Sequence, residues 1–202
     1  MKSKNINIVR NHRQVLHAKL APTCFATMLA LGMIMPAHAA VVAGNTNQPG
    51  IHTNANGTTV VDINKASAGG VSHNVYSEFN VDSNGVILNN SSSNSNTQLA
   101  GQIDGNANMA NGSAKVILNE VRSSDPSQLN GMIEVAGQSA QVIIANPSGI
   151  TCDGCGFINT NHATLTTGTA TYDNQGNVTG LDVSKGQVSI TGKGMDTRLQ
   201  RA

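Results

Sequence analysis

The chain has 202 residues, with 12 Lys or Arg against 11 Asp or Glu, and it contains no Trp. Five of the basic residues and none of the acidic ones fall within the first 39 positions, so residues 40–202 carry seven basic and eleven acidic side chains, a net charge of −4. Nucleic-acid binding requires a basic surface, and this balance speaks against it.

Residues 1–39 have the pattern of an export signal. The basic side chains of this leader are Lys2, Lys4, Arg10, Arg13 and Lys19. An apolar stretch over 25–35, too short to span a bilayer, leads to Ala37-His38-Ala39, and this pattern predicts cleavage before Ala40. We therefore expect 1–39 to be an extended signal peptide and 40–202 to be one exported domain. A start codon assigned too far upstream is the alternative explanation of the long basic region.

Short apolar runs recur along the exported part and predict β-strands. Four of them begin at Val60, Val86, Val116 and Val142, at intervals of 26, 30 and 26 residues. They are rich in β-branched residues and bounded by Asn, Gly or Ser, which is typical of strands, and no segment shows the apolar stripe of a helix. A repeat of this length with few aromatic residues favours a parallel β-helix over a propeller, because stacked coils have a narrow core that Val, Ile and Leu can fill.

Asparagines lie at the ends of three runs, at Asn64, Asn90 and Asn146. Two interpretations are open: a ladder of paired side-chain amides between coils, or ordinary turn residues. Three segments interrupt the rhythm of the runs. They are the Asn- and Ser-rich stretch 89–96, expected to be a mobile loop, the turn 123–127, and the stretch 170–180, expected to be a hairpin protruding from the coil.

The stretch 146–160, NPSGITCDGCGFINT, holds the most unusual local pattern. Its first four residues predict a type I turn that ends the preceding strand. Cys152 and Cys155 suggest a redox pair, metal ligands together with His162, or a disulfide. Thioredoxin chemistry needs a helix start that is missing here, and a zinc site needs four ligands. In an oxidising compartment we therefore expect a disulfide that shapes a corner, and no metal.

Enzymatic activity is not expected, and neither is a cofactor. The sequence has no nucleophile elbow, phosphate-binding loop or HExxH motif. His52, His73 and His162 are scattered among polar residues and are expected on the surface. The acidic residues are spread singly, whereas a glycan-active β-helix enzyme would need paired carboxylates.

Three blocks of the sequence resemble a known family. They are residues 74–91 (NVYSEFNVDSNGVILNNS), residues 114–160 and residues 181–196 (LDVSKGQVSITGKGMD). These blocks are similar to the amino-terminal secretion domain of two-partner-secretion exoproteins, the filamentous-haemagglutinin type that heads large adhesins, haemolysins and contact-dependent inhibition toxins of Gram-negative bacteria. The resemblance implies an all-β fold, a right-handed parallel β-helix with an amino-terminal cap and extra-helical hairpin strands.

The resemblance also implies a secretion and targeting function. Such a chain passes through the inner membrane and periplasm, is bound by the POTRA domains of a partner outer-membrane transporter, and ends up secreted or on the cell surface. The family's two recognition motifs correspond here to Asn146, Pro147, Ser148, Gly149 and Ile150, and to Asn106, Ala107, Asn108 and Met109. Ala107 replaces the Pro of the second motif, which loosens that turn.

The chain ends at Ala202, whereas members of this family continue into long repeats and a functional carboxy-terminal region that contacts host or target cells. We therefore expect a truncated reading frame or a fragment. The alternative function is that of a stand-alone adhesin or carbohydrate-binding β-helix module, and dependence on a transporter separates the two hypotheses.

Overall fold

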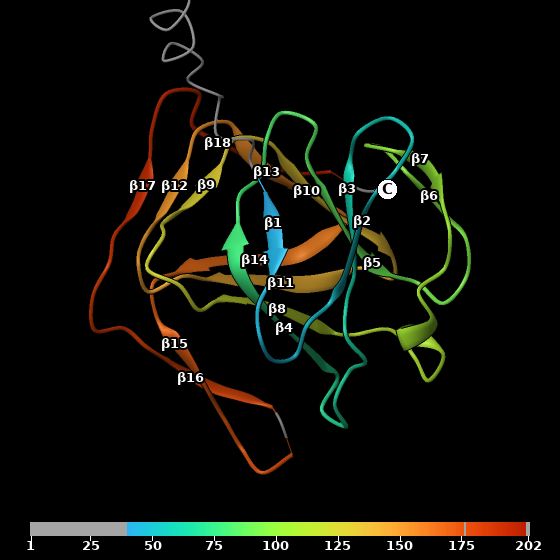
Figure 1. Cartoon of the computed structure of the whole chain (residues 1–202), viewed down its shortest axis with the longest axis horizontal. Coiled ribbons are helices and arrows are strands. Elements are labelled where there is room, and N and C mark those ends of the chain that lie inside the picture. The colour runs from blue at the N-terminus through green and yellow to red at the C-terminus, as the bar shows by residue number, and fades with distance from the viewer. Residues whose placement is uncertain (1–39, 176, 201–202) are drawn as a thin grey trace, which may run out of the picture. The chain divides into compact units, whose positions relative to one another are not determined.

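The computed structural model describes residues 40–175 and 177–200, and the regular secondary structure of this part is almost entirely β-strand (Figure 1). The predicted signal peptide, residues 1–39, lies outside the described residues. Within the described part, no helix has the length and apolar character that crossing a lipid bilayer requires. A single 3-10 turn, η1 (Ala107–Met109), is the helical element that it contains.

Three sheets wind around a common core, and we name them A, B and C. Sheet A consists of β1 (Val41–Ala43), β4 (Val71–Phe79), β8 (Val116–Val121), β11 (Ala140–Ala145) and β14 (Thr160–Thr166). Sheet B consists of β2 (Gly50–Thr53), β3 (Thr59–Asp62), β5 (Val86–Asn90), β10 (Met132–Gly137), β13 (Cys155–Ile158) and β18 (Met195–Gln200). Sheet C consists of β9 (Ser127–Leu129), β12 (Ile150–Cys152) and β17 (Val188–Ile190).

Neighbouring strands of the three sheets are parallel except at the amino-terminal edges. There β1 pairs antiparallel with β4, and β2 pairs antiparallel with β3. The remaining pairs are parallel, so the chain returns to the same sheet coil after coil. This arrangement confirms the predicted parallel β-helix, and β1 and β2 form its amino-terminal cap.

Side chains alternate between the inside and the outside of the coil, because successive residues of a strand point to opposite faces. On β8, Ile117 belongs to the central core while Leu118 belongs to a cluster on the outer face of sheet A. Branched aliphatic side chains dominate the central core. Near the cap it also holds an aromatic pair, Tyr76 and Phe79, with ring centroids 4.9 Å apart. A core of stacked Val, Ile and Leu explains why so few aromatic residues suffice.

Two antiparallel hairpins lie outside the coil, each against the outer face of one sheet. β6 (Ser95–Thr97) and β7 (Gly101–Ile103) cover sheet B, where Ile103 packs with Ile87. β15 (Thr169–Tyr172) and β16 (Val178–Asp182), the orange and red arm in Figure 1, cover sheet A, where Ala170 packs with Leu118 and Ile143. The prediction of a hairpin at 170–180 is confirmed, and the hairpin β6–β7 was not predicted.

The predicted repeat is correct where both strands belong to one sheet, and it is wrong where the two strands belong to different sheets. Val60 lies beside Ile87 in sheet B, and Val142 lies beside Ile117 in sheet A, so both 26-residue intervals connect successive coils with a shift of one residue. The 30-residue interval instead joins β5 of sheet B to β8 of sheet A. The hairpin β6–β7 and the turn η1 are inserted between those two strands and lengthen this coil.

Of the two interpretations left open for Asn64, Asn90 and Asn146, the ladder of paired amides is wrong. In the described part, the side-chain amides of these three residues bond to other segments of the chain and not to one another. Two other asparagines, Asn74 and Asn119, are register partners on β4 and β8 inside the coil. The stacked amides therefore occur within strands and not at their ends.

The stretch 89–96 is not the simple loop predicted from its composition. Asn89, Asn90 and Ser91 are buried, and the first two belong to β5. The side-chain amide of Asn90 donates to the carbonyl oxygens of Ala114 (2.9 Å) and Gln138 (2.8 Å). In a sequence, polar side chains that satisfy backbone groups inside a coil cannot be told from loop residues. This is why the stretch was predicted to be a mobile loop.

Candidate functional site

The first predicted recognition motif, residues 106–109, forms the corner that precedes β8. Asn106 is 3% exposed, and its side-chain amide donates to the carbonyl oxygens of Ile63 (2.8 Å) and Asn89 (3.0 Å). Its side-chain oxygen accepts the backbone N–H of Asn108 (3.0 Å) and so caps η1, from which Met109 enters the core. One side chain thus ties this corner to the ends of β3 and β5 in sheet B. The corner forms with Ala in place of the family's Pro.

The second motif, residues 146–150, forms the corner between β11 of sheet A and β12 of sheet C. The buried amide of Asn146 donates to the carbonyl oxygen of Asp125 and to Oγ of Ser127, both at 3.0 Å. Its side-chain oxygen accepts the N–H of Ser148 at 2.9 Å, and its carbonyl oxygen accepts the N–H of Gly149 at 3.0 Å. These bonds close the predicted turn and join it to the preceding coil. Gly149 adopts a φ of 122°, which favours glycine.

Both corners hide the side chains that define the motifs. Asn146, Ile150 and Met109 are at most 1% exposed. The positions that reach the surface are Ala107, Asn108 and, in part, Pro147 and Ser148. The first corner contacts strands of sheet B and the second contacts β9 of sheet C, so the two motifs sit at different corners of the coil. The folded domain therefore does not present their side chains as one exposed patch.

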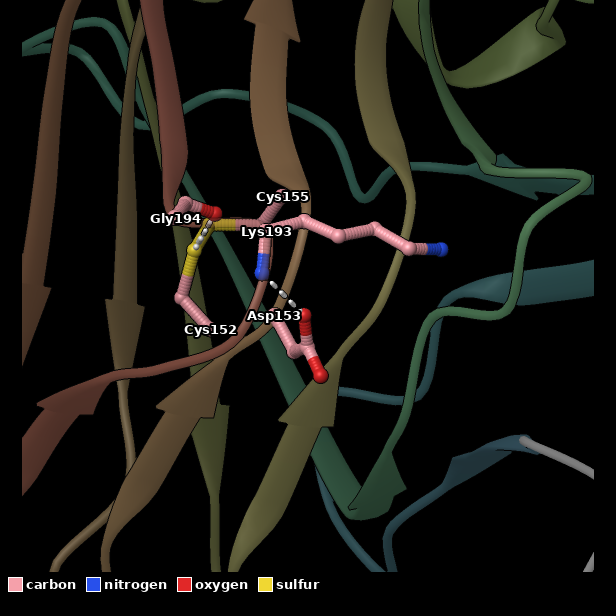
Figure 2. Close-up of a disulfide and its surroundings, with 5 residues drawn as sticks. All are labelled: Cys152, Asp153, Cys155, Lys193 and Gly194. Atoms are coloured by element: carbon pink, nitrogen blue, oxygen red, sulfur yellow. Dashed lines mark hydrogen bonds between the residues drawn. A yellow bond between two sulfur atoms is a disulfide. The ribbon is translucent and has the colours of Figure 1, made fainter.

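The two cysteines close a small loop at the next corner, between β12 and β13 (Figure 2). Cys152 and Cys155 form a disulfide with an S–S distance of 2.04 Å. Gly154, with a φ of 84°, makes the tight turn between them. The side chain of Asp153 accepts the backbone N–H of Lys193 at 2.7 Å, which fastens this loop to the following coil. The disulfide thus shapes a corner where two coils meet.

The other proposed ligand of these cysteines lies elsewhere. His162 is exposed on β14, and among the described residues no three His, Cys, Asp or Glu side chains gather where they could hold a metal. The side chain of His52 is 53% exposed and lies 3.6 Å from Asp62. These two histidines occupy the surface positions expected of them.

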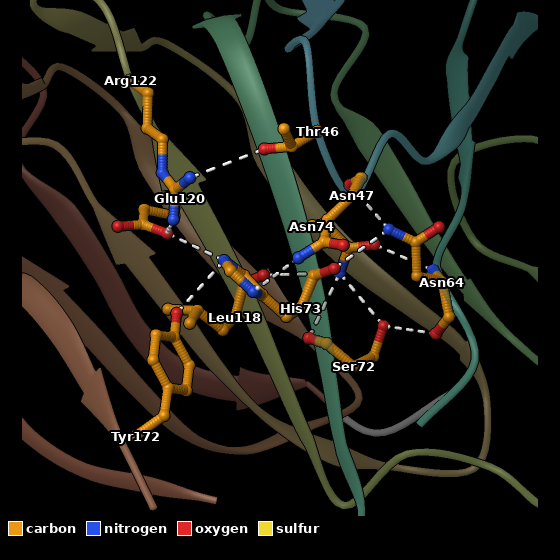
Figure 3. A network of polar contacts seen from close by, with 10 residues as sticks. All are labelled: Thr46, Asn47, Asn64, Ser72, His73, Asn74, Leu118, Glu120, Arg122 and Tyr172. Carbon is orange, nitrogen blue, oxygen red and sulfur yellow. Dashed lines mark hydrogen bonds and ion pairs between the residues drawn. The ribbon is translucent and has the colours of Figure 1, made fainter. Parts of the chain in front are cut away.

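The expectation that His73 is a surface residue is wrong. Its side chain is 19% exposed and lies in a polar network on the outer face of sheet A (Figure 3). Nε2 lies 2.8 Å from the Glu120 carboxylate and 3.1 Å from the Tyr172 hydroxyl, and Nδ1 lies 3.0 Å from the amide of Asn47. Arg122 also donates to Glu120, at 2.9 Å. The network joins the cap, the coil and the hairpin β15–β16.

Burial and charge act in opposite directions on this network. Burial raises the pKa of Glu120, but hydrogen bonds from His73 and Arg122 and the positive charge of Arg122 outweigh it, so the pKa lies below its ordinary value. Burial and the adjacent Glu120 carboxylate raise the pKa of Tyr172, so its hydroxyl keeps its proton. Glu120 is therefore an ionised, buried carboxylate with donors on several sides.

A second buried carboxylate, Glu134, lies under the other hairpin, β6–β7. It lies on β10 in sheet B and accepts the backbone N–H groups of Gln98 (2.8 Å) and Leu99 (2.9 Å), in the turn between β6 and β7. Burial raises its pKa against the lowering effect of these two bonds. The sequence holds one signal of both sites, a glutamate within a mostly apolar strand, in VILNEV (116–121) and MIEVAG (132–137).

Comparison with known proteins gives a family match over the whole described part. The family model described as the TPS secretion domain matches residues 37–201. The chain is 56% identical over 186 residues to a protein named toxin CdiA from Yersinia pestis, which covers 90% of the chain and 6% of that protein. It is 48% identical over 188 residues to a protein named tRNA nuclease CdiA from Yersinia mollaretii, which covers 93% of the chain and 6% of that protein.

A solved structure shows the same fold. The crystal structure of the filamentous hemagglutinin secretion domain superimposes with a TM-score of 0.71 at 38% sequence identity, covering 77% of this chain and 51% of that one. The chain therefore spans a small fraction of the sequence relatives, about 6%, and about half of this structural one.

Proposed function

Because this chain belongs to the family of TPS secretion domains, we propose that it directs the export of a larger protein across the outer membrane of a Gram-negative bacterium. In this proposal the signal peptide, residues 1–39, carries the chain across the inner membrane and is removed. The POTRA domains of the partner transporter then bind residues 40–202 in the periplasm. The family match over 37–201 is the observation that carries the proposal, and the shared β-helix supports it.

Because the two motifs are buried in the folded domain, the stage at which the transporter binds them is restricted. Asn106 and Asn146 have their amides bonded inside the folded corners, so a partner can reach these groups only before the corners close. Parallel sheets built from distant segments fold slowly, because loop closure precedes the contacts that stabilise it. We infer that the transporter binds the motifs in the unfolded chain, and that folding outside the cell then buries them.

The domain itself is not proposed to be an enzyme. Relatives carry names such as tRNA nuclease and 16S rRNA endonuclease, but the chain matches only about 6% of each. Both buried carboxylates of the described part, Glu120 and Glu134, are occupied by internal donors. Toxic or adhesive activity on a target cell would belong to regions of a larger protein that follow the matched part.

Co-expression with the cognate transporter tests the proposal. The full chain should appear in the medium when the transporter is present and stay in the periplasm when it is absent. Asn146→Ala should reduce export, because it removes the group that the transporter reads. Asn130→Ala is the matched control, since Asn130 is exposed and its backbone N–H, bonded to Val81 at 2.8 Å, does not depend on the side chain. Export without the transporter would refute the proposal.

A folding defect must be distinguished from a recognition defect. Binding of the purified POTRA region is therefore measured twice, to the chain held unfolded in urea and to the folded chain after refolding. Recognition of the open motif predicts binding to the unfolded chain, weakened by Asn146→Ala and unchanged by Asn130→Ala. Equal binding of the folded chain and of both variants would contradict recognition through Asn146. Strong binding to glycans with none to the POTRA region would favour the stand-alone adhesin.

A further inference from the structure

His73 contacts three segments that are far apart in the sequence, and we propose that it couples the hairpin β15–β16 to the amino-terminal cap. Its ring contacts Asn47 in the loop between β1 and β2, Glu120 on β8, and Tyr172 on β15 (Figure 3). In this proposal the hairpin is a strap. When it docks on sheet A it fixes the orientation of the His73 ring, and the ring fixes the cap loop.

The hydrogen bonds of the network define which nitrogen of the ring donates and which accepts. The amide of Asn47 donates, so Nδ1 accepts and the proton resides on Nε2, which donates to the Glu120 carboxylate. The hydroxyl of Tyr172 lies 3.1 Å from the same Nε2, and its ring packs on the imidazole with centroids 5.0 Å apart. Each of these three contacts holds the His73 ring in the orientation that the other two contacts need.

The cap loop, between β1 and β2, is held in its conformation by a few hydrogen bonds, so the loss of one of them should loosen it. Asn47 adopts a φ of 46°, a left-handed conformation that costs free energy for any residue other than glycine. Its carbonyl oxygen accepts the backbone N–H of Val75 (3.1 Å) and the side-chain amide of Asn64 (2.7 Å). The bond from its side chain to His73 adds a third tether. Loss of this tether allows the loop to leave its strained conformation more often.

The hairpin is able to fix the ring because it is itself firmly seated. Tyr172 and Ala170 pack with Leu118 and Ile143 in the apolar cluster on the outer face of sheet A. Tyr172 is 99 residues from His73 in the sequence. The cap therefore becomes fully ordered only after a distant segment has docked, and its order reports that the coils in between are complete. The coupling does not depend on the proposed export function.

Amide hydrogen exchange in the full chain tests the coupling. The readouts are the N–H of Val75, bonded to Asn47, and that of Gly44, bonded to Val75 at 2.8 Å. Tyr172→Ala should accelerate their exchange roughly 3- to 10-fold, the equivalent of losing about one hydrogen bond. Exchange in β10 should stay unchanged. Thr171→Ala is the matched control, because that exposed side chain contacts Thr179 within the hairpin.

Coupling between two sites is reciprocal, which supplies a second variant. Asn47→Gly removes the side chain and keeps a residue suited to the left-handed conformation. It should accelerate exchange of the Asp173 N–H, which is bonded to Asn177 within the hairpin, by a similar factor. The proposal is overturned if Tyr172→Ala loosens the hairpin and leaves the cap amides unchanged. Equal acceleration of β10 would also overturn it, because the hairpin would then stabilise the whole coil.

Discussion

Asn146→Ala is the sharpest perturbation of the second corner, because one side chain makes three hydrogen bonds there. The substitution leaves the carbonyl oxygen of Asp125, the hydroxyl of Ser127 and the N–H of Ser148 without their partner. Ser127 is buried, so water does not easily replace the lost donor. The coil loses a contact between β9 and the turn that leads into β12.

The expected loss of stability follows from these three bonds. A hydrogen bond contributes about 0.5–1.5 kcal/mol net, and a buried group left without a partner costs about 1–3 kcal/mol. We therefore expect Asn146→Ala to lower the free energy of unfolding by roughly 3 kcal/mol, a large share of the roughly 5–15 kcal/mol typical of a domain. With a urea m-value of about 1–3 kcal/mol/M, the midpoint should fall by roughly 1–3 M.

Urea unfolding followed by far-UV circular dichroism measures this loss, with Asn130→Ala as the control. Asn146→Asp adds a test of the mechanism. It keeps the size and the oxygen that accepts from Ser148, but it turns an acceptor toward Asp125 and Ser127 until it is protonated. Its stability relative to Asn146→Ala should therefore rise as the pH falls. A midpoint for Asn146→Ala within 0.2 M of the control, or no such rise for Asn146→Asp, would refute the assignment of these bonds.

Three further outcomes are expected. Periplasmic material should have the intact mass of a chain with one disulfide, and two free thiols would contradict the Cys152–Cys155 bond. Reduction of this bond should lower stability only slightly, because the loop that it closes is very short. The pKa of Glu120 is lowered, so its stabilising effect is complete above its ordinary value of 4.5 and is lost as the pH falls through the folded-state value. Wild type should thus exceed Glu120→Gln by about 1–3 kcal/mol at pH 7, and the difference should shrink below pH 4.5; a difference independent of pH would be inconsistent with an ionised Glu120. The purified chain should neither agglutinate erythrocytes nor bind glycan arrays, and specific glycan binding would contradict a purely secretory domain.

The sequence was sufficient to predict the fold, because its main determinants are local. Short β-branched runs, glycine turns and the two 26-residue intervals that connect successive coils are all visible in the sequence. The hairpin β15–β16 was predicted from its turn residues, whereas β6–β7 was obscured by the Asn- and Ser-rich stretch beside it. That insertion also changed the apparent period, since it placed 30 residues between strands that belong to different sheets.

The polar network was not predicted, because its members are brought together by the topology alone. His73 and Tyr172 are 99 residues apart, and Glu120 lies between them on a third segment. In the sequence each is a single polar residue among others. Only the register of β4 beside β8, and the docking of β15 across both, places the three side chains within bonding distance. Position within a solenoid depends on the sum of all insertions that precede a residue.

The asparagine content of the chain has a structural cause that limits what can replace it. The asparagines buried in the described part are Asn74, Asn89, Asn90, Asn106, Asn119 and Asn146. Their amides donate to backbone carbonyls of neighbouring coils, which a turning chain would otherwise leave unpaired. Among the described side chains, the oxygen of Asn89 is the buried polar atom without a partner. An aliphatic residue at these positions would fill the space but leave the carbonyls unsatisfied. These strand and corner positions therefore require asparagine even though the interior around them is apolar, and a low apolar content is compatible with a well-packed coil.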